Sequence, residues 1–345
     1  MRILDVVTEH TGPFKVLFEV LKDMLTETNI EFIASSKKND VDLKEENEND
    51  DDNEEKNEDE KDEDENEEEN NEDQELKNKK KKRKDCMKIT AIDTTKTVLI
   101  NLKLDADNFS KFTCKKNKLL LGVNLGCFYK LIKSMGKNDI LTLSVDHDNK
   151  NYLKIKIDSP DEKKDSEFNL KLLDLDETSM SIPEIAFDAV ITMDSQEFNK
   201  LCREMSNIAD YVEIKCLIDK IIFTCKGDFA DRKTTYRTMK SKNKGGDDDE
   251  GNILVSIQHA SETSKEAPQI VQGIFDLKNL VLFSKCASLC DDIEIYMKNS
   301  YPLVIKYTVA TLGRILLCLT PVDEDTTKTA NYSDEEEYYS DEEFK

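Results

Sequence analysis

The residue types able to do chemistry in this sequence are nine cysteines, three histidines and several paired basic side chains. The cysteines form no C-x-x-C pair, and His10, His147 and His259 lie apart among polar neighbours. A metal centre needs closely spaced ligands, and acid–base catalysis needs a base beside its partner. The sequence therefore predicts no metal site, no cofactor and no enzymatic activity, which leaves the basic pairs as the candidate functional groups.

The basic pairs lie in four segments whose apolar residues recur at spacings of three and four, as in amphipathic helices. These segments are residues 12–25, 125–136, 195–208 and 276–289. The pairs are Lys15 and Lys22, Lys130 and Lys133, Lys200 and Arg203, and Lys278 and Lys285. Their spacings of three or seven place both members on one helical face. A solvated face explains any single pair, but four such faces predict phosphate contacts that do not depend on base sequence.

Acidic residues beside these pairs favour a weak and mobile phosphate contact; they are Asp23, Glu27, Glu197, Glu204 and Asp276. The whole chain carries a formal net charge of −24, which would repel DNA if it were evenly spread. However, residues 36–86 hold 24 acidic and 12 basic residues, and residues 323–345 hold 10 acidic and 2 basic residues. Both segments contain too little apolar surface to fold. The other 271 residues have a net charge of only −4, so we expect a nearly neutral folded body.

The elements that must position the basic pairs are mainly strands. Much of the body alternates polar and apolar residues, as in DILTLSVD, NYLKIKID and DIEIYMK, which predicts antiparallel strands with one wet face. The order of strands and helices occurs twice, which indicates a duplicated unit. The acidic segment at residues 36–86 replaces a tight turn between two paired strands. No run of 18 apolar residues is present, so we expect no membrane segment.

Four stretches of the body are distinctive: CKKNKLLLGVNLGCFYKLIKSMGKNDILTL, KLLDLDETSMSIPE, SQEFNKLCREMSNIAD and YPLVIKYTVATLGRILLCLTP. In these stretches the chain resembles the proliferating cell nuclear antigen family, the ring-shaped sliding clamps of eukaryotic and viral DNA polymerases. The resemblance implies an α+β DNA clamp fold with two similar domains, each with two helices packed on antiparallel sheets. The domains would be residues 1–168, interrupted by the insertion at 36–86, and residues 188–322. A connector at 169–187 would join them, and an acidic tail at 323–345 would follow.

The resemblance also implies how the protein works. Three chains would close head to tail into a ring around duplex DNA, with the eight basic residues facing its phosphates. The ring would tether the polymerase as a processivity factor in DNA replication and repair, and a clamp loader would be a further partner. Ring closure would pair residues 166–171 of one chain with residues 232–239 of the next, beside a lengthened loop at 240–251.

A groove for short, aromatic-anchored motifs of polymerases and other DNA-processing proteins is the second implied site. Its residues would be Ile92, Thr97 and Leu99 from a first-domain loop, Met180, Ile182, Pro183 and Phe187 from the connector, and Tyr301, Pro302, Cys318, Thr320 and Pro321 near the C-terminus. Cys318 takes the place of the family's usual tyrosine, and Thr97 that of an aliphatic residue. We therefore expect the partner's motif to differ from the common one.

Other interpretations concern the attachments and the class of protein. We expect the insertion to leave the ring on the face opposite the groove. Its basic end, residues 77–85, is interpreted as a nuclear-import signal or as a counter-charge to the acid before it. The expected location is the nucleus, or a viral replication compartment. Two alternatives to the replicative clamp stay open: a related clamp for damage signalling or late viral transcription, and an acidic histone chaperone, which would not need four basic helices.

Overall fold

The computed structural model describes residues 1–34, 84–176, 185–238, 255–259 and 270–323. Residues 35–83 of the insertion, the connector residues Met180, Ile182 and Pro183, the 240–251 loop and the tail from 324 onward lie outside this description.

The first half of the chain forms β1 (Arg2–Thr8), α1 (Thr11–Met24), β2 (Glu27–Ile33), β3 (Cys86–Ile92), β4 (Val98–Asp105), the 3-10 turn η1 (Ala106–Asn108), β5 (Lys111–Cys114), β6 (Lys118–Asn124), α3 (Leu125–Ile132), β7 (Ile140–Asp146), β8 (Asn149–Ser159) and β9 (Lys164–Lys171). The second half forms β10 (Ala189–Asp194), α4 (Ser195–Ser206), β11 (Tyr211–Cys216), β12 (Lys220–Lys226), β13 (Asp231–Arg237), β14 (Val255–His259), β15 (Val271–Asp276), α5 (Leu277–Ser284), the 3-10 turn η3 (Lys285–Ser288), β16 (Asp292–Met297), β17 (Leu303–Val309) and β18 (Gly313–Leu319).

The two halves repeat one another element by element in the described residues, with β1 to β9 matching β10 to β18 and the helix pair α1 and α3 matching α4 and α5. All strand pairings in these residues are antiparallel. The prediction of an α+β fold of two similar domains is confirmed. The duplicated order read from the sequence is also confirmed.

One large sheet joins the domains. Its strand order is β14-β10-β16-β17-β18-β4-β3-β2-β6, and it crosses from the second domain to the first where β18 pairs with β4. A second sheet, β5-β1-β7-β8-β9, belongs to the first domain, and a third, β13-β12-β11-β15, belongs to the second. The domain junction is therefore a hydrogen-bonded ladder as well as a packed surface.

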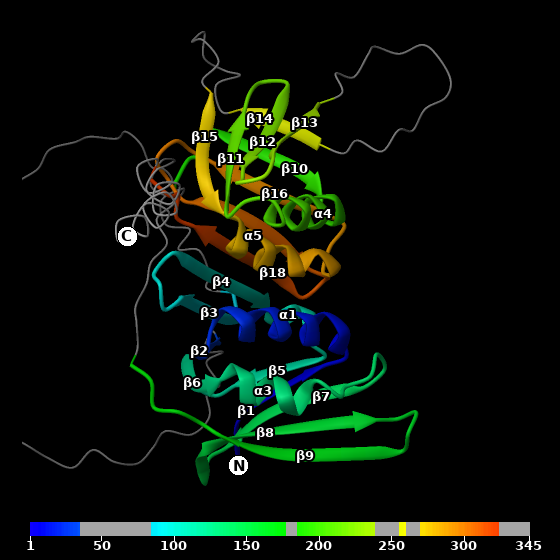
Figure 1. Ribbon diagram of the computed structural model, residues 1–345. Helices are drawn as coiled ribbons and strands as arrows, with labels where there is room; N and C mark the ends of the chain where they lie inside the picture. Colours follow the sequence, from blue (N-terminus) through cyan, green and yellow to red (C-terminus); the bar gives the residue numbers. More distant parts are fainter. Residues whose placement is uncertain (35–83, 177–184, 239–254, 260–269, 324–345) are drawn as a thin grey trace, which may run out of the picture.

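The four α-helices of the described residues lie on one face of the large sheet (Figure 1). We call this the helical face, and the opposite surface of the sheet the outer face. Phe14 and Phe18 of α1 pack with Phe128 of α3, with ring centroids 4.7 Å apart for both Phe14–Phe18 and Phe18–Phe128. These rings are fully buried, so the apolar stripe of each helix is covered by the sheets and its neighbour, and the polar stripe faces outward.

Local sequence explains where three helices begin. The side-chain oxygens of Asn124, Asp194 and Asp276 accept hydrogen bonds from backbone N–H groups three residues later, at 2.9, 2.7 and 2.8 Å. Such caps satisfy N–H groups that have no partner inside the helix. The acidic residues Asp194 and Asp276 therefore have a structural role at the helix ends.

Four expected boundaries were wrong. The helix expected over residues 125–136 ends at Ile132 and is followed by a turn. Cys86 was assigned to the insertion, but it is buried in β3 and pairs with Ile33 of β2. Residues 169–171 were assigned to the connector, but they complete β9, where Lys171 pairs with Tyr152. The helix expected through residue 289 ends at Ser284 and continues as a 3-10 turn. In each case pairing with a neighbouring strand, or a turn, decides where the element begins or ends. The spacing of apolar residues in the sequence does not show such pairings or turns.

Candidate nucleic-acid interface and peptide groove

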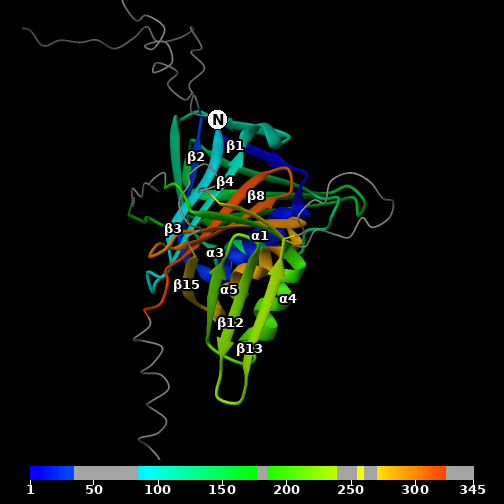
Figure 2. The same cartoon turned by 90° about the horizontal axis from the view of Figure 1, so that it is seen from above.

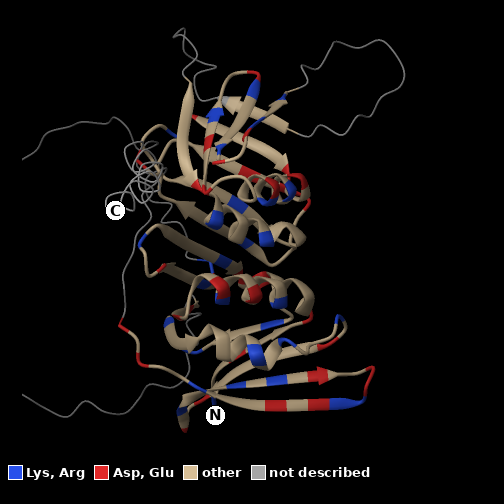
Figure 3. Cartoon of the chain, in the orientation of Figure 1, with Lys and Arg blue, Asp and Glu red and all other residues tan. Residues whose placement is uncertain are grey.

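The predicted phosphate-binding residues lie in or next to the helices of the helical face, whose ribbons carry both basic and acidic positions (Figure 3). Lys130 and Lys133 of α3, with Lys133 as the C-terminal cap, are both exposed. Lys200 and Arg203 of α4 and Lys278 of α5 are also exposed. The described structure thus leaves five of the eight predicted cations facing outward without a recorded ion pair.

The other three are engaged within the protein. The Lys15 ammonium group donates to the carbonyl oxygen of Met135 at 2.8 Å, so it ties α1 to the segment that follows α3. Lys22 and Lys285 both bind the carboxylate of Asp23, at 2.5 and 2.8 Å. Lys285 also begins the turn η3, so the expected continuous helical face from Lys278 to Lys285 was wrong.

The groove residues that the structure describes are organised by a row of side chains on the outer face. Direct strand partners lie on one face of a sheet, and here Ile92 pairs with Leu99, Leu99 with Cys318, and Cys318 with Val304. Val304 in turn pairs with Tyr296. The row therefore runs across β3, β4, β18, β17 and β16 and crosses the domain junction at Leu99 and Cys318.

Two members of this row, Val304 and Tyr296, were missed by the sequence analysis. Period-two alternation assigns both to the same outward set as the exposed residues of their strands. Strand alternation shows which face a residue takes, but it does not show which strands become neighbours. The sequence signal that could have identified Val304 is its hydrophobic side chain at an outward position of β17.

The remaining described groove residues surround this row. The Thr320 N–H donates to the Thr97 carbonyl at 3.0 Å, which brings the first-domain loop against the exit of β18. The Phe187 ring packs 5.3 Å from that of Tyr296, and Lys298 lies 5.1 Å from the ring centre of Tyr301. Ile92 and Tyr301 are 40% and 42% exposed, so apolar surface is available at both ends. Pro302 is exposed and Pro321 half-buried.

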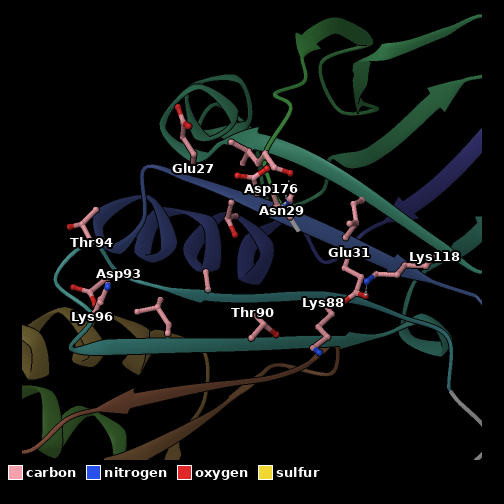
Figure 4. A pocket seen from close by; sticks show the side chains of 15 residues that line it. Glu27, Asn29, Glu31, Lys88, Thr90, Asp93, Thr94, Lys96, Lys118 and Asp176 are labelled. Atoms are coloured by element: carbon pink, nitrogen blue, oxygen red, sulfur yellow. Dashed lines mark hydrogen bonds and ion pairs between the residues drawn. The ribbon is translucent and has the colours of Figure 1, made fainter. Parts of the chain in front are cut away.

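A hollow of about 570 Å³ extends from Ile92 over the outer face of the first domain. Most of the residues that line it are polar or charged, and Figure 4 shows the Glu31 and Lys118 side chains pointing toward each other. These two groups form an ion pair at 3.2 Å. Lys88 and Thr90 of β3 also line this hollow. The apolar row therefore has a charged continuation on the first-domain side.

The connector begins along the edge of this hollow. The Leu173 N–H donates to the Gly122 carbonyl at 2.8 Å, and the Asn29 side-chain amide donates to the Asp176 carbonyl at 3.1 Å. A Cβ atom at residue 122 would lie 2.2 Å from the Leu173 carbonyl oxygen. Glycine at this position is therefore what allows the connector to approach β6 so closely.

Burial perturbs two ionisable groups of the row. Burial raises the pKa of the Cys318 thiol to about 11, so the side chain is a neutral apolar contact at physiological pH. Burial, followed by a hydrogen bond to the Glu294 carboxylate, raises the pKa of Tyr296 to about 12. The row thus presents neutral side chains to any partner.

Among the edge strands of the described residues, β9 and β13 lie at opposite ends of the molecule (Figure 1): β9 pairs only with β8 there, and β13 only with β12. The outward side chains of β9 include Asp165 and Glu167, and those of β13 include Lys233 and Arg237. On its inner side β13 lies beside α4 (Figure 2), where Arg232 pairs with Glu204 at 2.6 Å. The predicted ring-closing segments are thus both edge strands, although residue 239 lies outside the described part.

In the described residues no group of three or more histidine, cysteine or acidic side chains is arranged to hold a metal ion. Within the same residues, the helices are too short or too polar to cross a membrane.

Comparison with known proteins agrees with the fold. Residues 76–180 match the family model for the N-terminal domain of proliferating cell nuclear antigen, and residues 181–322 match that for its C-terminal domain. Over 240 residues the chain is 31% identical to the probable DNA polymerase sliding clamp 1 of Paramecium bursaria Chlorella virus 1, covering 68% of this chain and 84% of the relative. This two-domain clamp architecture defines the class of protein.

Two further comparisons extend this result. The probable DNA polymerase sliding clamp of Acanthamoeba polyphaga mimivirus is 29% identical over 240 residues, which is 69% of this chain and 47% of that protein, so the chain spans about half its length. The crystal structure of proliferating cellular nuclear antigen from Entamoeba histolytica shares the fold, with a TM-score of 0.68 at 20% identity, covering 94% of this chain and all of the other. The chain belongs to the proliferating cell nuclear antigen family.

Proposed function

We propose that this protein is a DNA sliding clamp, in which three copies form a closed ring that encircles duplex DNA and tethers a replicative polymerase. The single observation that carries the proposal is the arrangement of all described α-helices on one face of a sheet that runs through both domains. The names of the two viral relatives, both probable DNA polymerase sliding clamps, support it. The chain would act by enclosing DNA, with no chemistry of its own.

The repeat supports a specific way of closing the ring. Within the chain, β18 is the last strand of the second domain and pairs with β4 of the first. By the internal repeat, β9 corresponds to β18 and β13 corresponds to β4. Pairing β9 of one copy with β13 of the next would therefore repeat the domain junction between subunits. Such a head-to-tail contact closes when the rotation at each junction fits a full turn.

Charge on the two edges favours this pairing. Asp165 and Glu167 on the outward side of β9 would approach the strand that carries Lys233 and Arg237 in the neighbouring copy. Opposite charges at the rim of an interface guide association and orient the partners. Unpaired strand edges supply the backbone hydrogen bonds.

DNA contact would occur on the helical face. Lys130, Lys133, Lys200, Arg203 and Lys278 are exposed there and would neutralise phosphates as the duplex passes through the ring. Because lysine and arginine contacts to phosphate release counterions, this contact would weaken steeply with salt. Enclosure by the ring, and not affinity, would keep the clamp on DNA.

The outer-face row would be the docking site for short motifs of polymerases and other DNA-processing proteins, including those active in repair. Leu99, Cys318 and Val304 offer a neutral floor, and Ile92 and Tyr301 offer exposed apolar ends. Aromatic anchors gain the most from such a floor because they bury large areas at low entropic cost. Cys318 is smaller than a tyrosine, which leaves room for a larger anchor.

The acidic insertion would leave the molecule on the side away from this groove. β3 begins at Cys86, beside the insertion, and ends at Ile92, in the groove. Its seven residues, when extended, separate these two points by about 20 Å. For location we infer a compartment in which DNA is replicated, the nucleus or a viral replication compartment, since the two relatives named as probable DNA polymerase sliding clamps are viral.

Light scattering of the purified full chain tests the assembly. A closed trimer has a mass of about 119 kDa, three times the 39.6 kDa of one chain. A protein that stays at 39.6 kDa at micromolar concentration would refute the ring.

Calorimetric titration with a synthetic peptide bearing two aromatic anchors tests the groove. Val304→Glu should abolish binding, while Thr308→Glu, on the same strand and face but away from the row, should leave it unchanged. Equal binding by both variants would place the peptide elsewhere.

A further inference from the structure

Asp23 lies at the meeting point of the two domains on the helical face. Its Oδ1 atom is 2.5 Å from the Lys22 ammonium group of the same helix, α1. Its Oδ2 atom is 2.8 Å from the ammonium group of Lys285, at the start of η3 in the other domain. The carboxylate thus bridges two cations that are 263 positions apart in sequence, and we call this arrangement the Asp23 clip.

The clip also involves α3. The Lys22 ammonium group lies 5.1 Å from the ring centre of Tyr129, within the range of a cation–π contact. Lys22 is thereby held from two sides, by a carboxylate on α1 and by an aromatic ring on α3. Both domains and three helical elements meet around one acidic side chain.

The state of the carboxylate follows from its surroundings. Partial burial acts to raise the pKa of Asp23, but the hydrogen bonds and positive charges of Lys22 and Lys285 outweigh it and hold the pKa below its ordinary value. Asp23 is therefore ionised at neutral pH. One negative charge is set against two positive charges, so the clip contributes a net charge of +1 where two unpaired lysines would contribute +2.

Stability alone is a poor explanation for the clip. The side chains of Lys22, Asp23 and Lys285 are 25%, 28% and 39% exposed. Ion pairs with this much access to water stabilise a fold little, because water and salt screen them. Their position on the face that would meet DNA matters more, since a phosphate and a carboxylate compete for the same ammonium groups.

We propose that Asp23 is a positioning residue that competes with DNA phosphates for Lys22 and Lys285 and so keeps the contact between clamp and duplex weak. This inference rests on the proposed function, because it assumes that the helical face meets DNA. The two lysines then stay paired with Asp23 at the domain junction and do not bind phosphates. The five exposed cations on the other parts of the helical face make the contact with DNA. Removing the carboxylate releases both lysines to the duplex.

The test compares four variants of the full chain by fluorescence anisotropy with a labelled 20-base-pair duplex, from 50 to 200 mM salt. The first is Asp23→Asn. The second is Glu19→Gln, an equal loss of charge one helical turn earlier; in the described residues Glu19 has no ion pair to lysine, and its carboxylate accepts a hydrogen bond from the Tyr129 hydroxyl that glutamine can also accept. The third is Lys22→Met with Lys285→Met, and the fourth combines all three changes at positions 22, 23 and 285. Each newly neutralised phosphate steepens the salt dependence by about 0.9 log units per log unit of salt. Over this fourfold range of salt, that equals about a three- to fourfold gain in affinity at the low-salt end.

The expected result is a steeper salt dependence and tighter binding for Asp23→Asn alone. In the background without the two lysines, the same substitution should change binding no more than Glu19→Gln does. A wild-type slope for Asp23→Asn, or an equal gain in the lysine-free background, would overturn the inference while leaving the clamp intact. If the wild-type chain shows no salt-dependent binding at all, the proposed function fails and the inference fails with it.

Discussion

Reversing the charge of α3 should weaken the contact with DNA without opening the ring. Lys130 and Lys133 are exposed and have no recorded ion pair within the described part of the chain, so Lys130→Glu with Lys133→Glu removes two cations that the fold does not use. Affinity falls as salt rises, and each lost phosphate contact makes the negative slope of log affinity against log salt shallower by about 0.9. Between 50 and 200 mM salt, one lost contact costs about three- to fourfold in affinity, and two cost about tenfold.

The substitutions have a small structural cost. Both positions lie in the last turn of α3, where a negative charge opposes the helix dipole by about 0.3–1 kcal/mol per residue. α3 contacts β9, but the Lys130 and Lys133 side chains are exposed and neither residue belongs to the edge strands β9 and β13. The mass measured by light scattering should therefore stay that of the wild type.

A charge-matched control distinguishes the loss of a local contact between α3 and DNA from the effect of a changed net charge of the protein. Lys88 and Lys103 are strand partners on the outer face, opposite the helices, and their replacement by glutamate changes the net charge equally. Anisotropy with the same duplex should show the loss for the α3 variant alone. Equal losses for both variants, or an unchanged slope for the α3 variant, would refute a DNA contact at α3.

Three other outcomes are expected. Asp165→Lys with Glu167→Lys should shift the assembly toward monomers in sedimentation, and adding Lys233→Glu with Arg237→Glu should restore it; a variant that stays trimeric would contradict the edge pairing. Gly122→Ala should lower peptide affinity with no change of mass, because its Cβ would meet the Leu173 carbonyl at 2.2 Å and displace the connector; unchanged affinity would show that the connector start does not position the groove. Stability in urea should fall between pH 9 and pH 11, since burial raises the pKa of Cys318 from 9.0 to about 11 and of Cys216 to about 12. The folded state keeps protons there that the unfolded state releases, at up to about 1.4 kcal/mol per pH unit for each thiol. Equal midpoints at pH 8 and pH 10 would contradict this.

The fold could be predicted from the sequence because both the strand period of two and the helical period of about 3.6 residues are regular in it. Strands such as β11, with alternating buried and half-buried residues, and helices such as α4, with buried residues at positions 198, 201, 202 and 205, follow the pattern that burial on one face requires. The duplicated order also survives in the three-dimensional pairing. The acidic insertion did not obscure it, because the strands that flank it, β2 and β3, pair as a hairpin.

The site was predicted less completely, and the reasons are contacts between distant residues. Helical spacing placed Lys22 and Lys285 on exposed faces, but it contains no information on Asp23, which binds both across the domain junction. Alternation placed Val304 and Tyr296 outward, but only the register from β4 to β16 shows that they continue the groove row. The roles of the eight basic residues and of the groove residues stay predictions.

The central claim, that the protein encloses DNA, has one direct test that needs neither a polymerase nor a loader. The full chain is incubated at low salt with a linear duplex whose ends are free, or with the same duplex carrying a bulky protein block at both ends, and bound protein is measured after chemical crosslinking. A ring that threads over ends should be recovered on the open duplex and be absent from the blocked one. Equal recovery on both would show that the protein binds the side of DNA, and would contradict the sliding clamp.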